Sequence, residues 1–210
     1  FPRKELDFTR VTKSYGLSER PIRKTSTKFR IIGIGDSFTE GTGVPQDSTW
    51  LRRLESNLNA DSTVQIETVN AGIGGSDPIY GYRLLQDKLL DLNPKVVILS
   101  VNSSDITDIA YRGGFERFYE DGTSGRKPPK WEWLYQLSHL VRLVAHNGLH
   151  LNHYLVSPED ELAGRKIALQ SLKQIATDLT VLGNDNGFEP LIVIHPIIYD
   201  FNHSQYLDSE

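Results

Sequence analysis

Four short runs with the character of β-strands, each ended by a polar or glycine-rich turn, constrain the fold of this chain more than any other feature. The runs span residues 30–34, 64–69, 95–101 and 191–194. The first is continuous in its apolar character, which is typical of a strand covered on both faces, and the third is strongly apolar. Amphipathic helical patterns lie between the runs, for example Leu51, Leu54 and Leu58 after the first. This alternation predicts a parallel sheet with helices on both faces, a three-layer α/β fold.

The composition is that of one domain with a sizeable core. The chain has 210 residues, 38% of them hydrophobic, which is enough for a hydrophobic core that needs no disulfide or structural metal to stabilise it. It has no cysteine, which excludes disulfides, thiolate chemistry and Cys-ligated metals and leaves the redox compartment open. No apolar run reaches the ~20 residues of a membrane span. We therefore expect no spanning segment in this chain.

Residues 1–29 are predicted to be an irregular, basic lead-in to a domain that covers residues 30–210. Residues 1–30 hold nine Lys/Arg against three Asp/Glu, whereas the whole chain has a net charge of −4. The lead-in lacks a helical period, which favours an exposed edge strand that its charges protect from self-pairing. The alternative is contact with a membrane or a polyanion. We expect no chemistry there.

The second half of the chain holds an insertion and two long helical patterns. Residues 111–131 combine glycines and prolines with aromatic side chains, as in a lid, a substrate wall or a self-packed surface loop. Residues 131–155 and 158–182 are each predicted to form a long helix. On the first of these, four histidines at positions 139, 146, 150 and 153 share one helical stripe. Because no Asp, Glu or Cys joins them, we predict a helix face rather than a metal site.

The segments richest in polar groups all follow predicted strands. They are Gly35-Asp36-Ser37, residues 70–75, residues 102–105 and His195-Pro196. Ligands of open parallel sheets bind beyond the carboxyl ends of the strands. Ser37 therefore has two interpretations: it is a nucleophile, or the Ser of a Ser37-x-x-Glu40 capping box, and one side chain can serve as both. A dinucleotide or P-loop site is disfavoured because the required glycine and Lys-Ser/Thr are lacking.

At these strand ends the chain resembles the SGNH (GDSL) hydrolases, a family of serine esterases and acyltransferases. The similarity lies in Gly35-Asp36-Ser37 with Gly41, in Asn70-x-Gly72-x-x-Gly75, and in the polar turn that ends in Asp105. It implies a flavodoxin-like sheet and a nucleophile at Ser37. It also implies an oxyanion hole formed by the backbone N–H groups of Ser37 and Gly75 with one side-chain donor.

The side-chain donor of the oxyanion hole has two candidates. The family's third block is Gly-x-Asn-Asp, and here Ser104 stands where that Asn belongs. A hydroxyl can donate, but it has a shorter reach. Asn102 lies two residues earlier and faces the same side of an extended backbone. Either residue could take the role, or both could serve only the loop backbone.

The general base that a serine nucleophile needs is the weakest part of the resemblance. Asp200 and His203 match the family's Asp-x-x-His, but Asp200 follows the Pro196 that ends the fourth run by only four positions. A further helix and strand normally come between, and these need about 15 residues. We therefore expect Asp200 and His203 to be a decoy and the true pair to lie beyond residue 210. His195 is a weaker candidate.

The sequence thus predicts a serine-dependent ester hydrolase that acts without a cofactor or metal. Its substrate is expected to be a small-molecule or carbohydrate ester, such as an O-acetylated sugar, and no nucleic acid is expected as a partner. An O-acyltransferase shares the first half-reaction, and a catalytically silent domain that binds glycans or a protein partner is the rival from another class. The resemblance implies an extracytoplasmic location. The sequence leaves the oligomeric state open.

Overall fold

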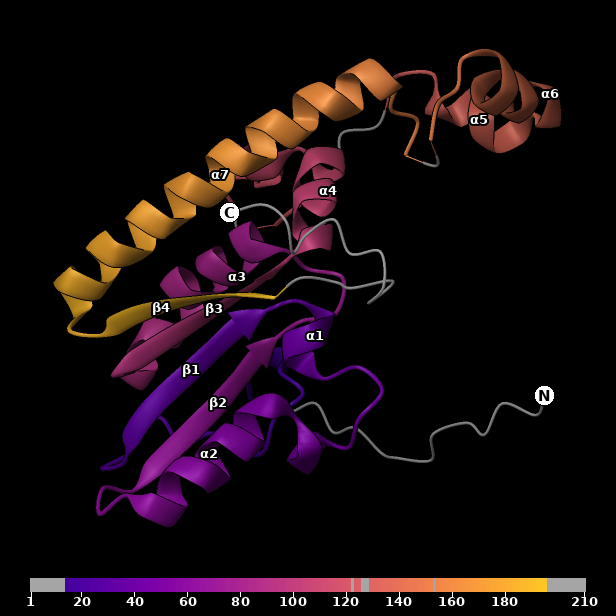
Figure 1. The fold of residues 1–210 in the computed structure, drawn as a ribbon. Helices are drawn as coiled ribbons and strands as arrows, with labels where there is room; N and C mark the ends of the chain where they lie inside the picture. Colours follow the sequence, from indigo (N-terminus) through magenta and orange to yellow (C-terminus); the bar gives the residue numbers. More distant parts are fainter. Residues whose placement is uncertain (1–13, 122, 126–128, 153, 196–210) are drawn as a thin grey trace, which may run out of the picture. The chain divides into compact units, whose positions relative to one another are not determined.

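The computed structural model describes residues 14–121, 123–125, 129–152 and 154–195. In this part of the chain, four strands form one parallel sheet in the order β2-β1-β3-β4 (Figure 1). The strands are β1 Phe29–Gly35, β2 Ile66–Gly72, β3 Val96–Asn102 and β4 Glu189–His195. Each overlaps one of the four predicted runs. The predicted α/β architecture with a parallel sheet is confirmed, and the strand order is the flavodoxin-like one.

Seven α-helices connect the strands or extend from them in the described residues: α1 Ser37–Glu40, α2 Trp50–Asp61, α3 Pro78–Leu84, α4 Ser103–Arg112, α5 Glu132–Leu137, α6 His139–Leu143 and α7 Pro158–Asn186. The chain forms two compact units. The first unit contains Phe1–Ser103 and Ile175–Glu210, and the second contains Ser104–Gln174. All four strands belong to the first unit.

Helices cover both faces of the sheet because β1 is apolar on both sides. A Cβ atom built on Gly33 would lie 2.4 Å from Cδ1 of Leu51, so α2 packs directly on this side of β1. The next residue, Ile34, points to the opposite face of the sheet. On that face, a Cβ built on Gly81 of α3 would lie 3.5 Å from the Cβ of Ile34. Leu51 and Ile34 are both completely buried. The three layers that the sequence predicts are therefore present.

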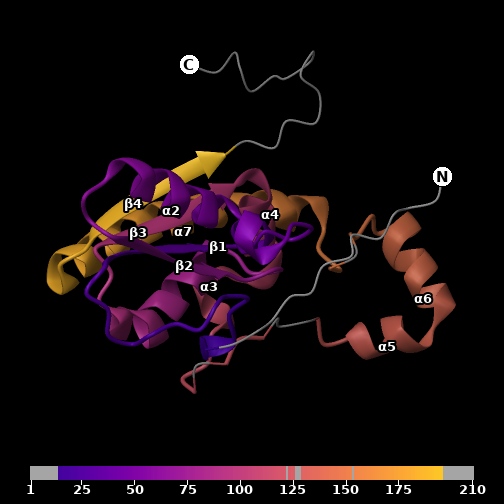
Figure 2. The same cartoon turned by 90° about the horizontal axis from the view of Figure 1, so that it is seen from below.

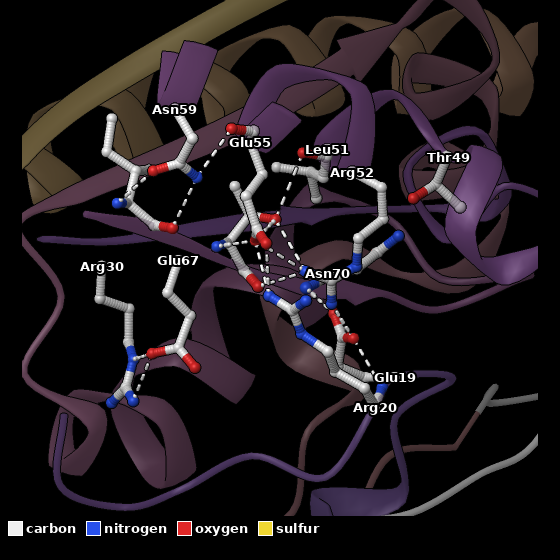
Figure 3. Close-up of polar contacts among 12 residues, drawn as sticks. Glu19, Arg20, Arg30, Thr49, Leu51, Arg52, Glu55, Asn59, Glu67 and Asn70 are labelled. Carbon is white, nitrogen blue, oxygen red and sulfur yellow. Dashed lines mark hydrogen bonds and ion pairs between the residues drawn. The ribbon is translucent and has the colours of Figure 1, made fainter. Parts of the chain in front are cut away.

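The outer edge of β2 is closed by side chains (Figure 3). Three backbone N–H groups point away from β1, and each donates to a side-chain oxygen: Ile66 to Asn59 at 2.8 Å, Thr68 to Glu55 at 2.6 Å, and Asn70 to Glu19 at 2.6 Å. Nη1 of Arg52 also donates to the carbonyl oxygen of Thr68 at 2.9 Å. An edge satisfied in this way offers few groups for pairing with another chain.

The described part of the lead-in contributes to this edge, contrary to the prediction of an exposed edge strand. Residues 14–28 contain no strand, and Glu19 is 1% exposed. Its carboxylate forms a buried ion pair with Arg52 of α2 and accepts hydrogen bonds from the backbone N–H groups of Arg20 and Asn70. A buried carboxylate needs such partners. The buried Glu19 and its ion pair with Arg52 therefore attach this segment to the β2 edge, and charge repulsion does not keep the segment away from the sheet. The remainder of the lead-in, residues 1–13, lies outside the described residues.

The Glu55 carboxylate predicts how stability responds to acid. Burial raises its pKa, but hydrogen bonds from Arg20 and Thr68 outweigh that effect, so the pKa lies below its usual value. The stabilisation is therefore present above the unfolded-state pKa of about 4.3 and is lost as the pH falls through the lower folded-state value. In urea titrations between neutral pH and pH ~3, the free energy of unfolding of Glu55→Gln should fall less steeply with decreasing pH than that of the wild type. Asp61→Asn, an exposed change at the end of α2, should keep the wild-type slope.

The opposite edge of the sheet differs from β2. In β4, residues 191–194 are all apolar, and their exposed fractions run from 38% for Ile192 to 75% for Ile194. The first run, predicted to be covered on both faces, is largely buried as β1, and so is β3. Within the described residues, β4 is instead largely exposed.

The second unit departs most from the predicted elements. The polar turn after β3 is the start of α4, which continues to Arg112. The long helix predicted over residues 131–155 is instead α5, α6 and a π-helical turn at Val144–Gly148. Ser138 breaks it by adopting an extended conformation and capping α6. The predicted histidine stripe is also wrong, because His150 lies past the last turn with φ +51°. His153 lies outside the described residues.

Candidate active site

Ser37 is the first residue of α1, immediately beyond the carboxyl end of β1. The helix is capped by the residue before it: the Asp36 backbone is extended, and its Oδ1 accepts a hydrogen bond from the Phe38 N–H at 3.0 Å. The expectation that Ser37 caps the helix is therefore wrong. Asp36 leaves the strand with the extended backbone that a cap requires. Because Asp36 caps the helix, the Ser37 hydroxyl is not needed as a cap. Within the described residues it makes no hydrogen bond.

Asp36 also joins two strand ends. Its second oxygen, Oδ2, accepts a hydrogen bond from Nδ2 of Asn102, the last residue of β3, at 2.9 Å. Both side chains are buried, at 5% and 2% exposed. A buried carboxylate that caps one segment and holds another fixes both relative to each other. Asn102, predicted as an oxyanion donor, thus has a positioning contact beside Ser37, and its donor role remains a prediction.

The end of β2 and the turn after it pack closely against α1, most tightly at Gly72. A Cβ on Gly72 would lie 2.2 Å from the backbone N of Glu40, and a Cβ on Gly74 would lie 2.6 Å from Oε2 of the same residue. The Gly74 position is also 3.9 Å from Cβ of Ser37. Two of the predicted strand-end segments, Gly35-Asp36-Ser37 and residues 70–75, are therefore in contact.

Replacing Gly72 with Ala should cost stability, because the atoms that its Cβ would meet are backbone atoms that cannot rotate away. We expect a loss of about 2–3 kcal/mol in the free energy of unfolding, from overpacking. The matched control is Gly81→Ala in α3, where the new Cβ makes ordinary contact at 3.5 Å with Ile34. That change should be neutral or stabilising, because Ala favours helix more than Gly does. Urea unfolding of both variants checks this, and equal stabilities would contradict the packing argument.

Glycine at position 75 and asparagine at position 70 are favoured for different physical reasons. Gly75 is exposed with φ +73°, and a Cβ there would meet open space, so its backbone conformation rather than crowding favours glycine. Asn70 is buried; its Nδ2 donates to the Thr39 carbonyl oxygen at 2.8 Å, and its Oδ1 accepts from the Gly72 N–H at 3.0 Å. Asn70 ties α1 to the turn. The role of Gly75 as a backbone donor stays a prediction.

A cavity of about 410 Å³ lies next to Ser37. It is lined by Ser37, Phe38, Gly41, Thr42, Val44, Ser48, Thr49 and Trp50. Most of these residues belong to the loop between α1 and α2, which sequence reasoning did not connect with the site. The available signal was the position of this loop directly after the Ser37 helix, since such connections line the sites of parallel sheets.

The other predicted site residues lie in different places. Ser104, the alternative donor, is the second residue of α4 and belongs to the second unit. Asp200 and His203 lie outside the described residues. His195 ends β4, opposite Asn102 in the strand register, and its ring centroid lies 5.0 Å from that of Phe38. Within the described part of the first unit, His195 is the only histidine.

The described residues contain neither a candidate metal-binding cluster nor a helix able to span a membrane. Among the described residues, no group of three His, Cys, Asp or Glu side chains could hold a metal ion. His146 instead forms hydrogen bonds with the Tyr135 hydroxyl and the Leu151 carbonyl oxygen, each at 2.8 Å. No helix in the described ranges is both long enough and apolar enough to cross a membrane.

Comparison with known proteins gives weak likenesses in structure only. No family profile and no curated protein matches the chain. An SGNH-hydrolase family esterase, AlinE4, matches at 22% identity over 39% of this chain and 44% of its own, with a TM-score of 0.34. The acetyl xylan esterase AlAXEase matches at 21% identity over 78% and 76% of the two chains, with a TM-score of 0.34. Esterase EstA from Pseudoalteromonas sp. matches at 19% identity over 79% and 78%, with a TM-score of 0.38.

Proposed function

We propose that this protein is a serine-dependent ester hydrolase that forms an acyl-enzyme on Ser37. The observation that carries the proposal is the contact between two strand ends: Ser37 has a hydroxyl not needed for capping, and the Gly72–Gly75 turn packs beside it. A nucleophilic serine requires an unengaged hydroxyl with backbone N–H donors close by. The cavity lined by Ser37, Phe38 and Trp50 provides space for an ester group.

The proposed reaction has two half-reactions. The Ser37 oxygen attacks the ester carbonyl carbon, its proton passes to a histidine, and the carbonyl oxygen becomes an oxyanion that the N–H groups of Ser37 and Gly75 stabilise. The carbon–oxygen bond to the alcohol then breaks, and the alcohol leaves with the proton. Water adds to the acyl-serine in the same way, which releases the carboxylic acid and restores the Ser37 hydroxyl.

A small acyl group such as acetyl is the proposed substrate group, and an O-acetylated carbohydrate is the proposed ester. The cavity of about 410 Å³ is lined in part by Ser48, whose hydroxyl suits a polar substrate better than a long hydrocarbon chain. If a sugar hydroxyl replaces water in the second half-reaction, the same site is an O-acyltransferase. Release of free acetate from acetylated xylan, measured with and without an added acceptor sugar, separates the two.

Labelling with a serine-directed fluorophosphonate tests the proposal. The full-length protein should gain one label, and peptide mapping should place it on Ser37. Ser37→Ala should remain unlabelled, whereas Ser48→Ala, which alters the same cavity, should still react. An unlabelled wild-type protein would favour the silent binding domain. The buried Asn102 amide, which already donates to Asp36, is the observation that supports this second function.

The histidine that accepts the proton is tested separately. We expect His203→Ala to keep most of the turnover of the full-length protein, because Asp200 follows Pro196 by only four positions. A loss as large as that of Ser37→Ala would instead identify His203 as the base. His195→Ala should also keep most of its turnover, but with altered substrate affinity, since its ring packs on Phe38 at the cavity.

A further inference from the structure

A surface in the second unit presents large apolar side chains to solvent. It is formed by α5, α6 and the π-helical turn Val144–Gly148, with α5 and α6 meeting at a sharp corner (Figure 2). Leu137 is 80% exposed and Leu140 is 70% exposed. We call this the hairpin surface; its exposed members are Trp133, Leu134, Leu137, Leu140, Leu143, Val144 and Leu149. So many exposed apolar residues in one short segment indicate a contact surface.

Several polar groups of the hairpin bond to one another across its corner. Nε of Arg142 donates to the Tyr135 carbonyl oxygen at 2.9 Å, and its guanidinium carbon lies 5.8 Å from the centre of the Tyr135 ring. The Tyr135 hydroxyl bonds to His146 at 2.8 Å, and the other ring nitrogen of His146 bonds to the Leu151 carbonyl oxygen. These contacts hold the corner together while the leucines remain outside. The arrangement is the reverse of a helix pair packed around its own apolar core.

An apolar cavity opens in the same hairpin. It has a volume of about 270 Å³ and is lined by Trp131, Leu140, Val141, Val144, Ala145 and Leu149. All six side chains are apolar or aromatic, and no charged group takes part. A site of this chemistry accepts hydrocarbon rather than a polar ligand.

The hairpin segment carries a small excess of positive charge, although the whole chain is acidic. Between residues 129 and 157, Lys130 and Arg142 stand against a single acid, Glu132, and the segment also holds four histidines, which are neutral in the net charge at pH 7. The chain as a whole has a net charge of −4. Tryptophan, leucine and basic residues in one short amphipathic segment are typical of elements that lie at the lipid–water interface.

We propose that the hairpin surface binds the surface of an anionic phospholipid membrane. The leucines and Trp133 enter the boundary between headgroups and acyl chains, and the exposed Lys130 lies at the level of the lipid phosphates. With six and five residues, α5 and α6 are much shorter than the ~20 residues of a span, so they lie on the membrane. A second copy of this chain fits less well, because pairing like surfaces would bring the same cations together.

Vesicle flotation tests this binding. The full-length protein should float with vesicles of mixed zwitterionic and anionic phospholipid and much less with purely zwitterionic vesicles. The double variant Leu137→Glu/Leu140→Glu should bind roughly tenfold more weakly or worse, because it removes apolar burial and adds repulsion. The matched control is Leu162→Glu/Ile167→Glu on α7, at positions 60% and 57% exposed in the same unit. It should bind like the wild type.

Several outcomes would overturn the proposal. They are a lack of binding to either vesicle, equal binding by the Leu137→Glu/Leu140→Glu variant, and weakened binding by the α7 control. Self-association that depends on Leu137 and Leu140 without vesicle binding would assign the surface to a second copy. All mutated side chains are exposed, so thermal unfolding should give wild-type midpoints. Ser37→Ala should bind vesicles normally, which keeps this test independent of the proposed esterase activity.

Discussion

Replacing Ser37 with Ala is expected to lower the rate of p-nitrophenyl acetate hydrolysis by at least about 10³-fold, because the proposed mechanism forms the acyl intermediate on the Ser37 hydroxyl. The residual rate would come from the remaining oxyanion donors. The Ser37 hydroxyl does not cap α1, since Asp36 has that role, so its removal should leave the thermal midpoint unchanged. The variant therefore separates catalysis from folding.

The control for this experiment is Ser48→Ala, a hydroxyl deletion in the same cavity. It should retain most of the wild-type kcat and change mainly KM, since Ser48 would contact substrate without reacting with it. Wild-type turnover by the Ser37→Ala variant would contradict the nucleophile assignment. Equal losses in both variants would show that the assay reports the shape of the cavity rather than a covalent step.

The second large effect is expected at Glu19. Its carboxylate is 1% exposed, pairs with Arg52 and accepts the backbone N–H of Asn70. Glu19→Ala would leave that N–H and part of the Arg52 charge buried without their acceptor. Removing one partner of a buried ion pair costs about 3–5 kcal/mol. We expect a loss of this size in the free energy of unfolding, measured by urea titration.

A double-mutant cycle provides the control for Glu19. If the loss comes from the pair, Arg52→Ala and the double variant should show strong non-additivity, because the second change removes a charge that the first left without its partner. Asp91→Ala breaks the exposed pair of Lys24 and Asp91 and should leave the unfolding midpoint unchanged. A Glu19→Ala variant as stable as the wild type would show that the β2 edge does not need this side chain.

The sheet was predictable because its signal is local. β1 and β3 come from strongly apolar runs, and parallel order follows from the helices between the runs, so the ends of both strands were predicted to within about one residue. The capping residue was not predictable, since Asp36 and Ser37 are both good caps and only the backbone at the strand end decides between them. A local sequence pattern shows that a capping residue is present, but it does not show which of two neighbouring residues has the backbone conformation of the cap.

The remaining errors concern distant contacts and short interruptions. Glu19 lies in a basic segment and looks exposed, but its partner Arg52 comes from a helix 33 positions later. The helix predicted over residues 131–155 fails at Ser138, whose hydroxyl caps a new helix by accepting from the Val141 N–H. One polar residue in a leucine-rich pattern gives no strong stop signal. The loop that lines the Ser37 cavity was missed for a similar reason, because a connecting loop has no periodicity.

The most direct test of the central claim is to trap the acyl group. The full-length protein is mixed with p-nitrophenyl acetate, quenched in acid during turnover and digested, and the peptides are analysed by mass spectrometry. We predict one acetyl group on the peptide that contains Ser37 and none in the Ser37→Ala variant. Steady turnover without any acetylated peptide, or with the acetyl group on another residue, would contradict the account.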